Sequence, residues 1–579
     1  MSKSTKPKRR DGFDRRTFLR ASGATTVTGA FAALAGCNSN GNGDGNGNGG
    51  GGGTTTITDG TPSSELTRVP EVNFVTWTQS GSPDVFEASR IIANNLEDLG
   101  LSITLDPQQF PQPIISTLFE SREFDMSAIS YVGTAVRLDP SFYLNTVLHS
   151  DGISSGGWNF SAYDNQEFDQ LSDSQQSTLE QEARREAVYD AQQLAYEDQA
   201  VTVYNSPDTS IGLNTQRFER PAQTVPGEGL LGMYSLTRIQ GKNGNSTLTL
   251  PQARNTFGAI NPVAVQEAEV NEFLRPMYDT LMRVAPNGQA APWIIDDITF
   301  EDDTTATVTL TDGLTFHDGE PVTAEDVKFS FDYQRENQAP YVSTYIEPVD
   351  SVEVVDDLTV QFNLVEPYAP FQMLTLGLVP IIPMHIWNDV DQPMEFSNDP
   401  PVGSGPFEFS RRQEGSLLEY NAVKDHPQAP NIDRLRIRLF GNMSSAQQAL
   451  LNGELDGIWE LPTTLQGDVD NNQSVELYFK PSHSIVTMVH NMRRGMPYSD
   501  RAFRRAVAHA VPNEAISQQI YGGNSDPGGS IISSANEFWH NPDVGHFTFD
   551  KEQARSTLRE AGYDWDDDGR LLMPAGNGE

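Results

Sequence analysis

The sequence predicts an α/β protein with several domains. Beyond about residue 70, short apolar runs typical of strands alternate with stretches that have helical periodicity. A chain of 579 residues exceeds the size of one domain, and its length predicts about two to four. Hydrophobic residues make up 37% and charged residues 20%, which is typical of folded rather than disordered chains.

The first folded segments alternate between strand and helix. VNFVTW (72–77) predicts a strand and residues 82–100 a helix, with Ser82 as N-cap and Gly100 after its end. Further expected elements are strands over 101–107, 123–133 and 200–205, and one long helix over 165–199 whose apolar stripe includes Leu179.

A polar, glycine-containing run at 240–246 predicts a linker, after which a new unit begins. In it, FHDGEPVTAEDVKFSF (316–331) predicts a β-turn followed by a helix with Thr323 as N-cap. Later expected elements are a strand in 401–409, a helix closed by Gly453 and then a strand within 445–460, a strand over 484–492, and helices over 499–511 and 550–562.

The formal net charge of −40 excludes an ordinary nucleic-acid-binding protein, which would be basic. We interpret this charge as a solvated acidic surface. After residue 20 only five lysines occur, and an acidic, lysine-poor surface is similar to that of proteins from salt-loving archaea, where salt screens the self-repulsion.

The N-terminus is interpreted as an export signal. Arg15 and Arg16 precede Phe18-Leu19 and resemble a twin-arginine signal, and the mildly apolar run that follows is too short for a membrane-spanning helix. LAGC resembles a lipobox, so Cys37 is the expected lipidation site. Because Cys37 is the only cysteine, no disulfide or cysteine metal site is expected. We therefore expect a protein on the extracellular face of the cell membrane, anchored by a lipid and a Gly/Asn-rich tether.

Several motifs together resemble the family 5 extracellular solute-binding proteins of ABC importers, which include oligopeptide, dipeptide and nickel receptors. The motifs are FHDGEPVTAEDVKFSF, GSGPFEF, LLNGELDG, NMRRGMPYSDRAFRRAVAHAV and the helix ending LREAGYD. The resemblance extends over essentially everything from about residue 70. It implies a two-lobed periplasmic-binding-protein-like fold (class II, Venus-flytrap) with an accessory subdomain.

The order of these motifs departs from the family. Its FHDG segment lies in the first quarter of the mature chain, and segments like 72–77, 82–100 and 165–199 lie in its last third. The two parts of this chain are complementary, so we infer a circular permutation with new ends in a loop. The alternative is a fusion of fragments from two receptors. A permutation requires Leu571 and Val72 to lie in the same lobe.

The resemblance implies a division into six segments. Residues 1–36 are the expected signal peptide and 37–70 the tether. Lobe II is expected to combine 71–200 with 481–579, lobe I to combine 201–255 with 396–480, and the accessory subdomain to cover 256–395.

The resemblance implies a solute-binding receptor, not an enzyme. We expect it to capture a peptide-like or other small polar solute by hinge closure, without a cofactor, and to deliver it to ABC permease and ATPase subunits. A monomer is expected. A sensory or chemotaxis receptor with the same fold, or a nickel or metal-chelate binding protein, are the alternatives.

The expected ligand-binding residues lie where the resemblance places the cleft. They are Tyr131, Arg137, Trp158, Asn159, Asn255, Phe257, Asn491 and Arg493. Oligopeptide-binding members hold the peptide's amino group with an aspartate whose position here is Val136. Arg137 beside it favours an anion, which argues against a ligand with a free amine.

Two patterns in the sequence imitate other chemistry. G-x-S-x-G at 152–156 lacks the buried strand that a nucleophile elbow needs, so a hydrolase is not expected. His483 and His490 would point to opposite faces of a strand, and no metal site is expected from them.

Overall fold

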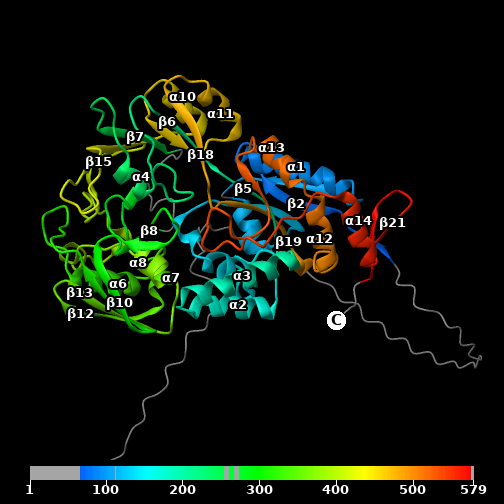
Figure 1. Cartoon of the computed structure of the whole chain (residues 1–579), viewed down its shortest axis with the longest axis horizontal. Coiled ribbons are helices and arrows are strands. Elements are labelled where there is room, and N and C mark those ends of the chain that lie inside the picture. Colours follow the sequence, from blue (N-terminus) through cyan, green and yellow to red (C-terminus); the bar gives the residue numbers. More distant parts are fainter. Residues whose placement is uncertain (1–65, 111, 253–259, 266–272, 576–579) are drawn as a thin grey trace, which may run out of the picture.

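The computed structural model describes residues 66–110, 112–252, 260–265 and 273–575. Arg15, Arg16 and Cys37 lie outside these ranges. The described chain forms a two-lobed α/β protein (Figure 1). Among the described residues, no helix combines the length and the apolar character that crossing a membrane requires.

Lobe II is built on a six-stranded sheet whose strands come from both ends of the chain. Its strand order is β20 (Ser525–Pro527), β5 (Thr202–Pro207), β19 (Ile485–His490), β4 (Met126–Tyr131), β2 (Val72–Trp77) and β3 (Ile103–Gln108). The strands β2, β3 and β4 run parallel, whereas β19 is antiparallel to both β4 and β5.

Alternate residues of a strand point to opposite faces of the sheet. Both faces of this sheet carry apolar side chains, and helices cover both. Phe74, Ala128 and Met488 belong to one buried cluster and Val75, Ile129 to another. The first cluster includes α1 (Pro83–Glu97), α12 (Arg501–Ala510), α13 (Asn513–Ile520) and α14 (Lys551–Glu560). The second includes α2 (Gln166–Ser177), α3 (Gln181–Asp198) and the irregular helix η4 (Phe142–Leu148).

The two ends of the described chain meet in this lobe. Strand β1 (Thr67–Arg68) pairs with β22 (Leu571–Met573), which pairs with β21 (Asp564–Trp565). Leu571 accepts a hydrogen bond from the Val69 amide at 2.9 Å and shares a buried cluster with Val72. The proximity that a permutation requires is therefore present.

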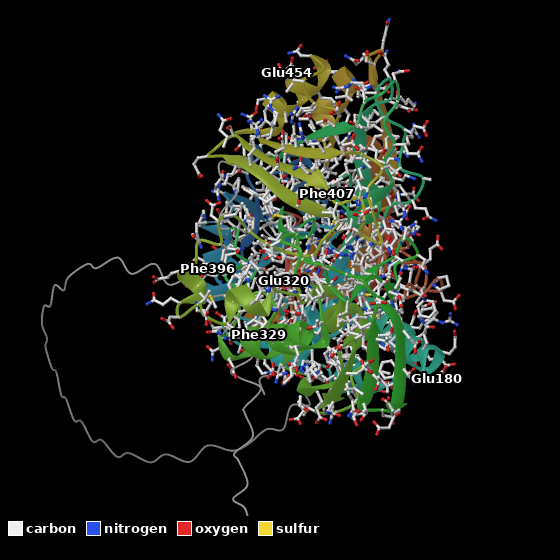
Figure 2. The ribbon with its side chains drawn as sticks, turned by 90° about the vertical axis from the view of Figure 1, so that its left-hand side faces the viewer. Glu180, Glu320, Phe329, Phe396, Phe407 and Glu454 are labelled. Atoms are coloured by element: carbon white, nitrogen blue, oxygen red, sulfur yellow. The ribbon has the colours of Figure 1, made fainter. Side chains whose placement is uncertain are left out.

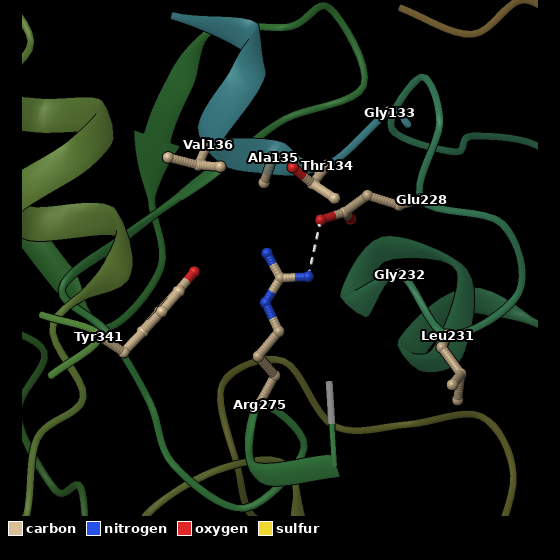
Figure 3. A pocket seen from close by; sticks show the side chains of 9 residues that line it. All are labelled: Gly133, Thr134, Ala135, Val136, Glu228, Leu231, Gly232, Arg275 and Tyr341. Carbon is tan, nitrogen blue, oxygen red and sulfur yellow. Dashed lines mark ion pairs between the residues drawn. The ribbon is translucent and has the colours of Figure 1, made fainter. Parts of the chain in front are cut away.

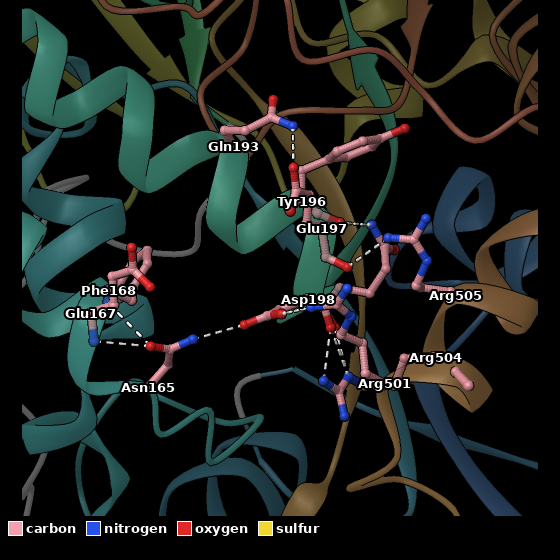
Figure 4. Close-up of polar contacts among 12 residues, drawn as sticks. Asn165, Glu167, Phe168, Gln193, Tyr196, Glu197, Asp198, Arg501, Arg504 and Arg505 are labelled. Carbon is pink, nitrogen blue, oxygen red and sulfur yellow. Dashed lines mark hydrogen bonds and ion pairs between the residues drawn. The ribbon is translucent and has the colours of Figure 1, made fainter. Parts of the chain in front are cut away.

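Arginines of α12 also join the two ends of the chain, because they bind the C-terminal end of α3 (Figure 4). Arg504 is buried and donates to the carbonyls of Asp198 and Gln199, and Arg505 donates to that of Glu197. Arg501 pairs with the Asp198 carboxylate at 3.0 Å. These cations satisfy orphan carbonyls at the negative end of the helix.

Lobe I contains three larger sheets. The first consists of β17 (Gly457–Trp459), β6 (Thr209–Asn214) and β18 (Val475–Lys480). The second consists of β14 (Phe407–Gln413), β15 (Leu417–Ala422), β16 (Arg434–Leu439) and β7 (Thr247–Gln252). The third consists of β10 (Ile295–Asp302), β11 (Thr305–Leu310), β13 (Thr359–Leu364) and β12 (Val349–Asp356). A short ladder joins β8 (Met282–Val284) to β9 (Ala290–Pro292). The helices include α4 (Met233–Arg238), α6 (Ala324–Glu336), α7 (Ser343–Ile346), α10 (Met443–Leu451) and α11 (Thr463–Asp470).

Figure 2 shows the side chains of both lobes. Phe407 of lobe I lies in the core, whereas Glu454 of lobe I and Glu180 of lobe II project from the rim of the molecule.

The FHDG motif has a structural role. The His317 ring Nε2 lies 2.9 Å from the Gly405 carbonyl and Nδ1 accepts from the Gly403 amide. It thus ties FHDG to the GSGP turn. The helix that follows begins at Ala324 with Thr323 as N-cap, as predicted, and the Asp326 carboxylate accepts from the Thr323 amide.

Two expectations about the elements were wrong. The helix predicted over 165–199 is broken between α2 and α3, because the Glu180 carboxylate accepts the first amides of α3 and starts a new helix. Leu179 is consequently exposed at the break. The boundary expected at 200 was also misplaced, because β5 pairs with β19 in lobe II and the chain crosses to lobe I near Asp208.

Candidate ligand-binding site

The chain crosses between the lobes twice, after β5 and before β19, at one edge of the six-stranded sheet. Since β19 is antiparallel to both neighbours, β5 runs in the same direction as β2, β3 and β4. All four therefore end at that edge. In open α/β sheets, ligands bind outside the carboxyl ends of such strands.

The turn after β4 enters lobe I. Within the short helix η3 (Ala135–Leu138), Ala135 and Leu138 belong to the buried cluster of lobe I. Elsewhere the Ala369 amide of lobe I donates to the Gln176 carbonyl of lobe II at 2.8 Å, and the Thr463 hydroxyl donates to Asp84 at 3.3 Å. The lobes are thus in contact, as in a closed hinge protein.

A pocket lies where this turn meets lobe I (Figure 3). Water-sized molecules can occupy only about 20 Å³ of it, and the site opens to solvent. Lobe II contributes Gly133, Thr134, Ala135 and Val136, and lobe I contributes Glu228, Leu231, Gly232, Arg275 and Tyr341. We call this the interlobe pocket.

Among the described residues that line the interlobe pocket, the charged ones are Arg275 and Glu228. Arg275 pairs with Glu228 at 2.9 Å, and their side chains are 19% and 9% exposed. Figure 3 shows Arg275 reaching from lobe I toward Glu228 and the Gly133–Val136 turn, with Tyr341 to one side. This pair can bind a polar solute group of either charge, because both partners lie partly removed from water.

A second arginine lies behind Arg275. Arg283 is 5% exposed, and burial together with the neighbouring Arg275 lowers its pKa to about 10. Burial opposes the ionisation of the nearby Asp279, but the pairing with His426 at 3.1 Å and the Trp293 indole N–H more than offset it, so the pKa of Asp279 is lowered.

Three of the expected site residues gather around Phe142. The Tyr131 ring packs against Phe142 and is 1% exposed, and burial raises the pKa of its hydroxyl. The Arg137 guanidinium lies 5.0 Å from the centroid of the Phe142 ring and donates to the Val132 carbonyl. Trp158 packs against the same ring and is half-buried. The side chain of Tyr131 is thus buried, whereas the side chains of Arg137 and Trp158 are partly exposed to solvent.

Three others hold loops. The Asn159 amide is fully buried and donates to the carbonyls of Leu148, His149 and Tyr163. Asn491 is also buried and donates to two carbonyls of the 122–124 turn. Arg493 donates to three carbonyls of the 153–160 loop.

These contacts leave Asn159 and Asn491 no amide hydrogen for a ligand, so we do not propose them as contacts. Asn255 and Phe257 lie outside the described residues. Glu228, Arg275 and Tyr341 line the pocket but were not predicted from the sequence. No periodicity distinguishes them, and only the packing of η3 into lobe I brings them together.

His483 lies at the second crossing between the lobes. Its ring is 1% exposed, and its Nε2 donates to the Thr134 carbonyl at 2.7 Å. A Cβ on Gly133 or Gly227 would meet the ring at 3.2 or 2.9 Å, so both glycines let it pack closely. Burial lowers the pKa of His483 to about 4. The other histidine considered, His490, is also buried, and its Nε2 lies 3.1 Å from the Thr202 hydroxyl.

A family profile described as "Bacterial extracellular solute-binding proteins, family 5 Middle" matches residues 289–578. A putative ABC transporter peptide-binding protein of Brucella ovis is 29% identical over 262 residues, covering 43% of this chain and 47% of the relative. The dipeptide-binding protein of Escherichia coli is 28% identical, covering 50% and 58%. This chain therefore spans about half the length of the curated relatives it matches.

Solved structures are similar over part of the chain. Bacillus subtilis AppA in complex with a nonapeptide has 20% identity and a TM-score of 0.45, covering 58% of this chain and 67% of that one. Listeria monocytogenes CtaP has 24% identity and a TM-score of 0.49, covering 55% and 66%.

The buried His483 predicts a pH-dependent stability. Its pKa is about 4 in the folded protein, below the ordinary value of about 6.5, so the unfolded chain binds more protons between these values. The contribution of His483 is complete above pH 6.5 and is lost as pH falls toward 4. Between pH 7.5 and 5, wild type should lose roughly 2 kcal/mol of unfolding free energy more than His483→Gln.

Urea unfolding at constant ionic strength measures this difference. The glutamine variant keeps an N–H donor for the Thr134 carbonyl but does not titrate. If both proteins lose the same stability over this range, the imidazole is not held neutral.

Proposed function

This chain belongs to family 5 of the bacterial extracellular solute-binding proteins, and we propose that it is the solute-binding receptor of an ABC importer. It captures a small polar solute between its lobes and delivers it to permease and ATPase subunits. No bond of the solute is broken. The observation that carries this proposal is the interlobe pocket, since both lobes contribute to it and a bound solute would hold them together.

The solute is a peptide or another small molecule with polar ends. Relatives named as peptide-, dipeptide- and oligopeptide-binding proteins support the class. Val136 lines the pocket and supplies no carboxylate for a ligand amine, whereas Glu228 does so from the opposite lobe. Arg275 offers a guanidinium for a carboxylate, and Arg137 and Trp158 flank the site from lobe II.

The chain is a circular permutant of the family order. Three observations support this proposal. Strand β1 pairs with β22, the six-stranded sheet draws on both ends of the chain, and the family profile matches only one continuous half. On this proposal, 71–200 and 481–579 form lobe II, 201–255 and 396–480 form lobe I apart from the shift at β5, and 256–395 is accessory.

The receptor is an extracellular, lipid-anchored monomer of a salt-loving organism, exported through the twin-arginine signal at Arg15-Arg16. The acidic composition and the sequence around Cys37 support this.

Solute capture predicts a co-purifying ligand. Native mass spectrometry of the protein from its own host should detect a bound small molecule. The double variant Glu228→Gln/Arg275→Gln should lose most of it, at least about tenfold, because each truncated charge leaves a polar ligand group unpaired.

The surface pair Arg438–Glu454 provides the matched control, since it is also an arginine–glutamate pair but lies exposed on lobe I. Arg438→Gln/Glu454→Gln should retain the ligand. Equal loss in both variants, or equal retention, would contradict a role for the interlobe pocket.

The permutation predicts that chain order is interchangeable. A rearranged chain of residues 246–575, a short Gly/Ser linker and residues 66–240 should fold, because Val69 and Leu571 are already hydrogen-bonded. Its Tm should lie within about 5 °C of the natural order, and it should retain the same solute. Failure of the rearranged chain to fold under conditions where the natural chain folds would count against permutation and favour a fusion.

Lipid anchoring predicts that Cys37→Ser moves the protein from the membrane fraction to the medium. Immunoblotting of fractionated host cells measures this. Unchanged membrane association of the variant would rule out Cys37 as the anchor.

A further inference from the structure

Helix α11 of lobe I begins without a side-chain cap from its own segment. Its N-cap position is Pro462, which makes no side-chain hydrogen bond, and its first turn holds no acidic residue. Asp468 and Asp470 lie in its last turn instead, where carboxylates oppose the helix dipole. The N-terminus of α11 therefore lacks a local side-chain acceptor for its first amides.

Asp84 of lobe II supplies an acceptor at this N-terminus. Thr463 is the first residue of α11, and its hydroxyl donates to the Asp84 carboxylate at 3.3 Å. Burial raises the pKa of Asp84, and hydrogen bonds from the Thr463 amide and hydroxyl partly offset this increase. A carboxylate is favourable at the positive end of a helix. Asp84 thus caps a helix that belongs to the other lobe.

Each partner is fixed within its own lobe. Asp84 lies in the first turn of α1, and the next residue, Val85, is buried in the core of lobe II. In lobe I, the Leu461 carbonyl just before α11 accepts from the Ser210 hydroxyl at 3.1 Å and from the Gln466 side chain at 2.9 Å. Neither side of the contact follows the other lobe, so separating the lobes at this point breaks the hydrogen bond.

The segment before α11 also packs against a loop that lines the interlobe pocket. Trp459 ends β17, and a Cβ added to Gly229 would lie 2.6 Å from its ring. The residue before this glycine is Glu228, which lines the interlobe pocket. Thr463 follows Trp459 by four residues. The capped end of α11 and the pocket carboxylate are thus joined by a short, packed path.

We infer that Asp84 is a positioning residue for solute capture, because its cap on α11 stabilises the closed arrangement in which both lobes line the interlobe pocket. The inference rests on the proposed function, since closure matters to capture only in a receptor. Asp84 acts on the equilibrium between open and closed lobes and not on the solute itself. The loss of an N-cap acceptor changes such an equilibrium about fivefold, and a solute that binds the closed state is affected equally.

The test measures the distance between the lobes in protein freed of solute by dialysis. Nitroxide labels are attached through Glu186→Cys in lobe II and Gln448→Cys in lobe I, which are both exposed. The background is Cys37→Ser, because Cys37 is the only cysteine. In pulsed electron–electron double resonance, Asp84→Ala should lower the closed-to-open ratio about fivefold. Thr463→Val removes the hydroxyl but keeps the amide and should lower the ratio about twofold.

Three further variants show whether the two side chains act together. In Asp84→Ala/Thr463→Val the shift should equal that of Asp84→Ala alone, because the hydroxyl has already lost its acceptor. Asp84→Asn keeps an acceptor oxygen and should retain most of the closed population. Glu87→Ala is the matched control, since it removes a carboxylate from the same helix that pairs with Arg90 inside lobe II. It should leave the ratio unchanged.

Thermal unfolding separates this role from a merely structural one, which would lower Tm without moving the ratio. An unchanged ratio in Asp84→Ala would overturn the inference, and so would effects of Asp84→Ala and Thr463→Val that add. If Asp84→Ala does not fold, Thr463→Val carries the test by itself.

Solute release distinguishes the failure of this inference from the failure of the proposed function. A solute that co-purifies should dissociate about fivefold faster from Asp84→Ala than from wild type. Equal dissociation rates would overturn the role of Asp84 in capture while the receptor function stands. A protein whose lobes close through Asp84 but that holds no solute would uphold the cap while the receptor function fails.

Discussion

Strand β19 forms hydrogen-bonded ladders with β4 on one side and β5 on the other, although the whole of lobe I lies between β5 and β19 in the sequence. This pairing fixes both ends of lobe I to adjacent strands at one edge of a sheet. The two crossings therefore lie side by side, which is the geometry a hinge requires. The same pairing joins the first and last parts of the described chain.

Closing the sheet in this way carries an entropic cost, because the paired strands are far apart in sequence. The contacts that offset it are concentrated where the two parts meet. The β1–β22 pairing, the buried clusters on both faces of the sheet and the α12 arginines at the end of α3 all join early residues to late ones. Arg504 is the most buried of these arginines, and its removal would expose several carbonyls to an apolar interior.

The sequence predicted much of this fold because local signals and packing agree there. The helix after Asp500 has a cap, a strong apolar stripe and a family motif, and it forms as expected. The prediction of one helix through Leu179 was wrong, because an apolar residue fits the periodic pattern whether or not the helix continues. The new helix starts where the Glu180 side chain caps it. Strand β5 was assigned to the wrong lobe because its partner, β19, lies far along the chain.

The site was less predictable, for a physical reason. An asparagine that binds backbone carbonyls and one that binds a ligand have the same sequence signature, and Asn159 and Asn491 prove to be of the first kind. Glu228 and Arg275 lie in segments without periodicity, so only tertiary packing identifies them.

The distribution of charge adds a constraint on any ligand. A net charge of −40 repels anions at long range, but at about 1 M salt the screening length falls to about 3 Å, so this repulsion fades before an anion reaches the surface. Buried arginines act at contact, where salt screens them least. In a salty medium this protein can thus combine an acidic surface with buried cations such as Arg283 and Arg504.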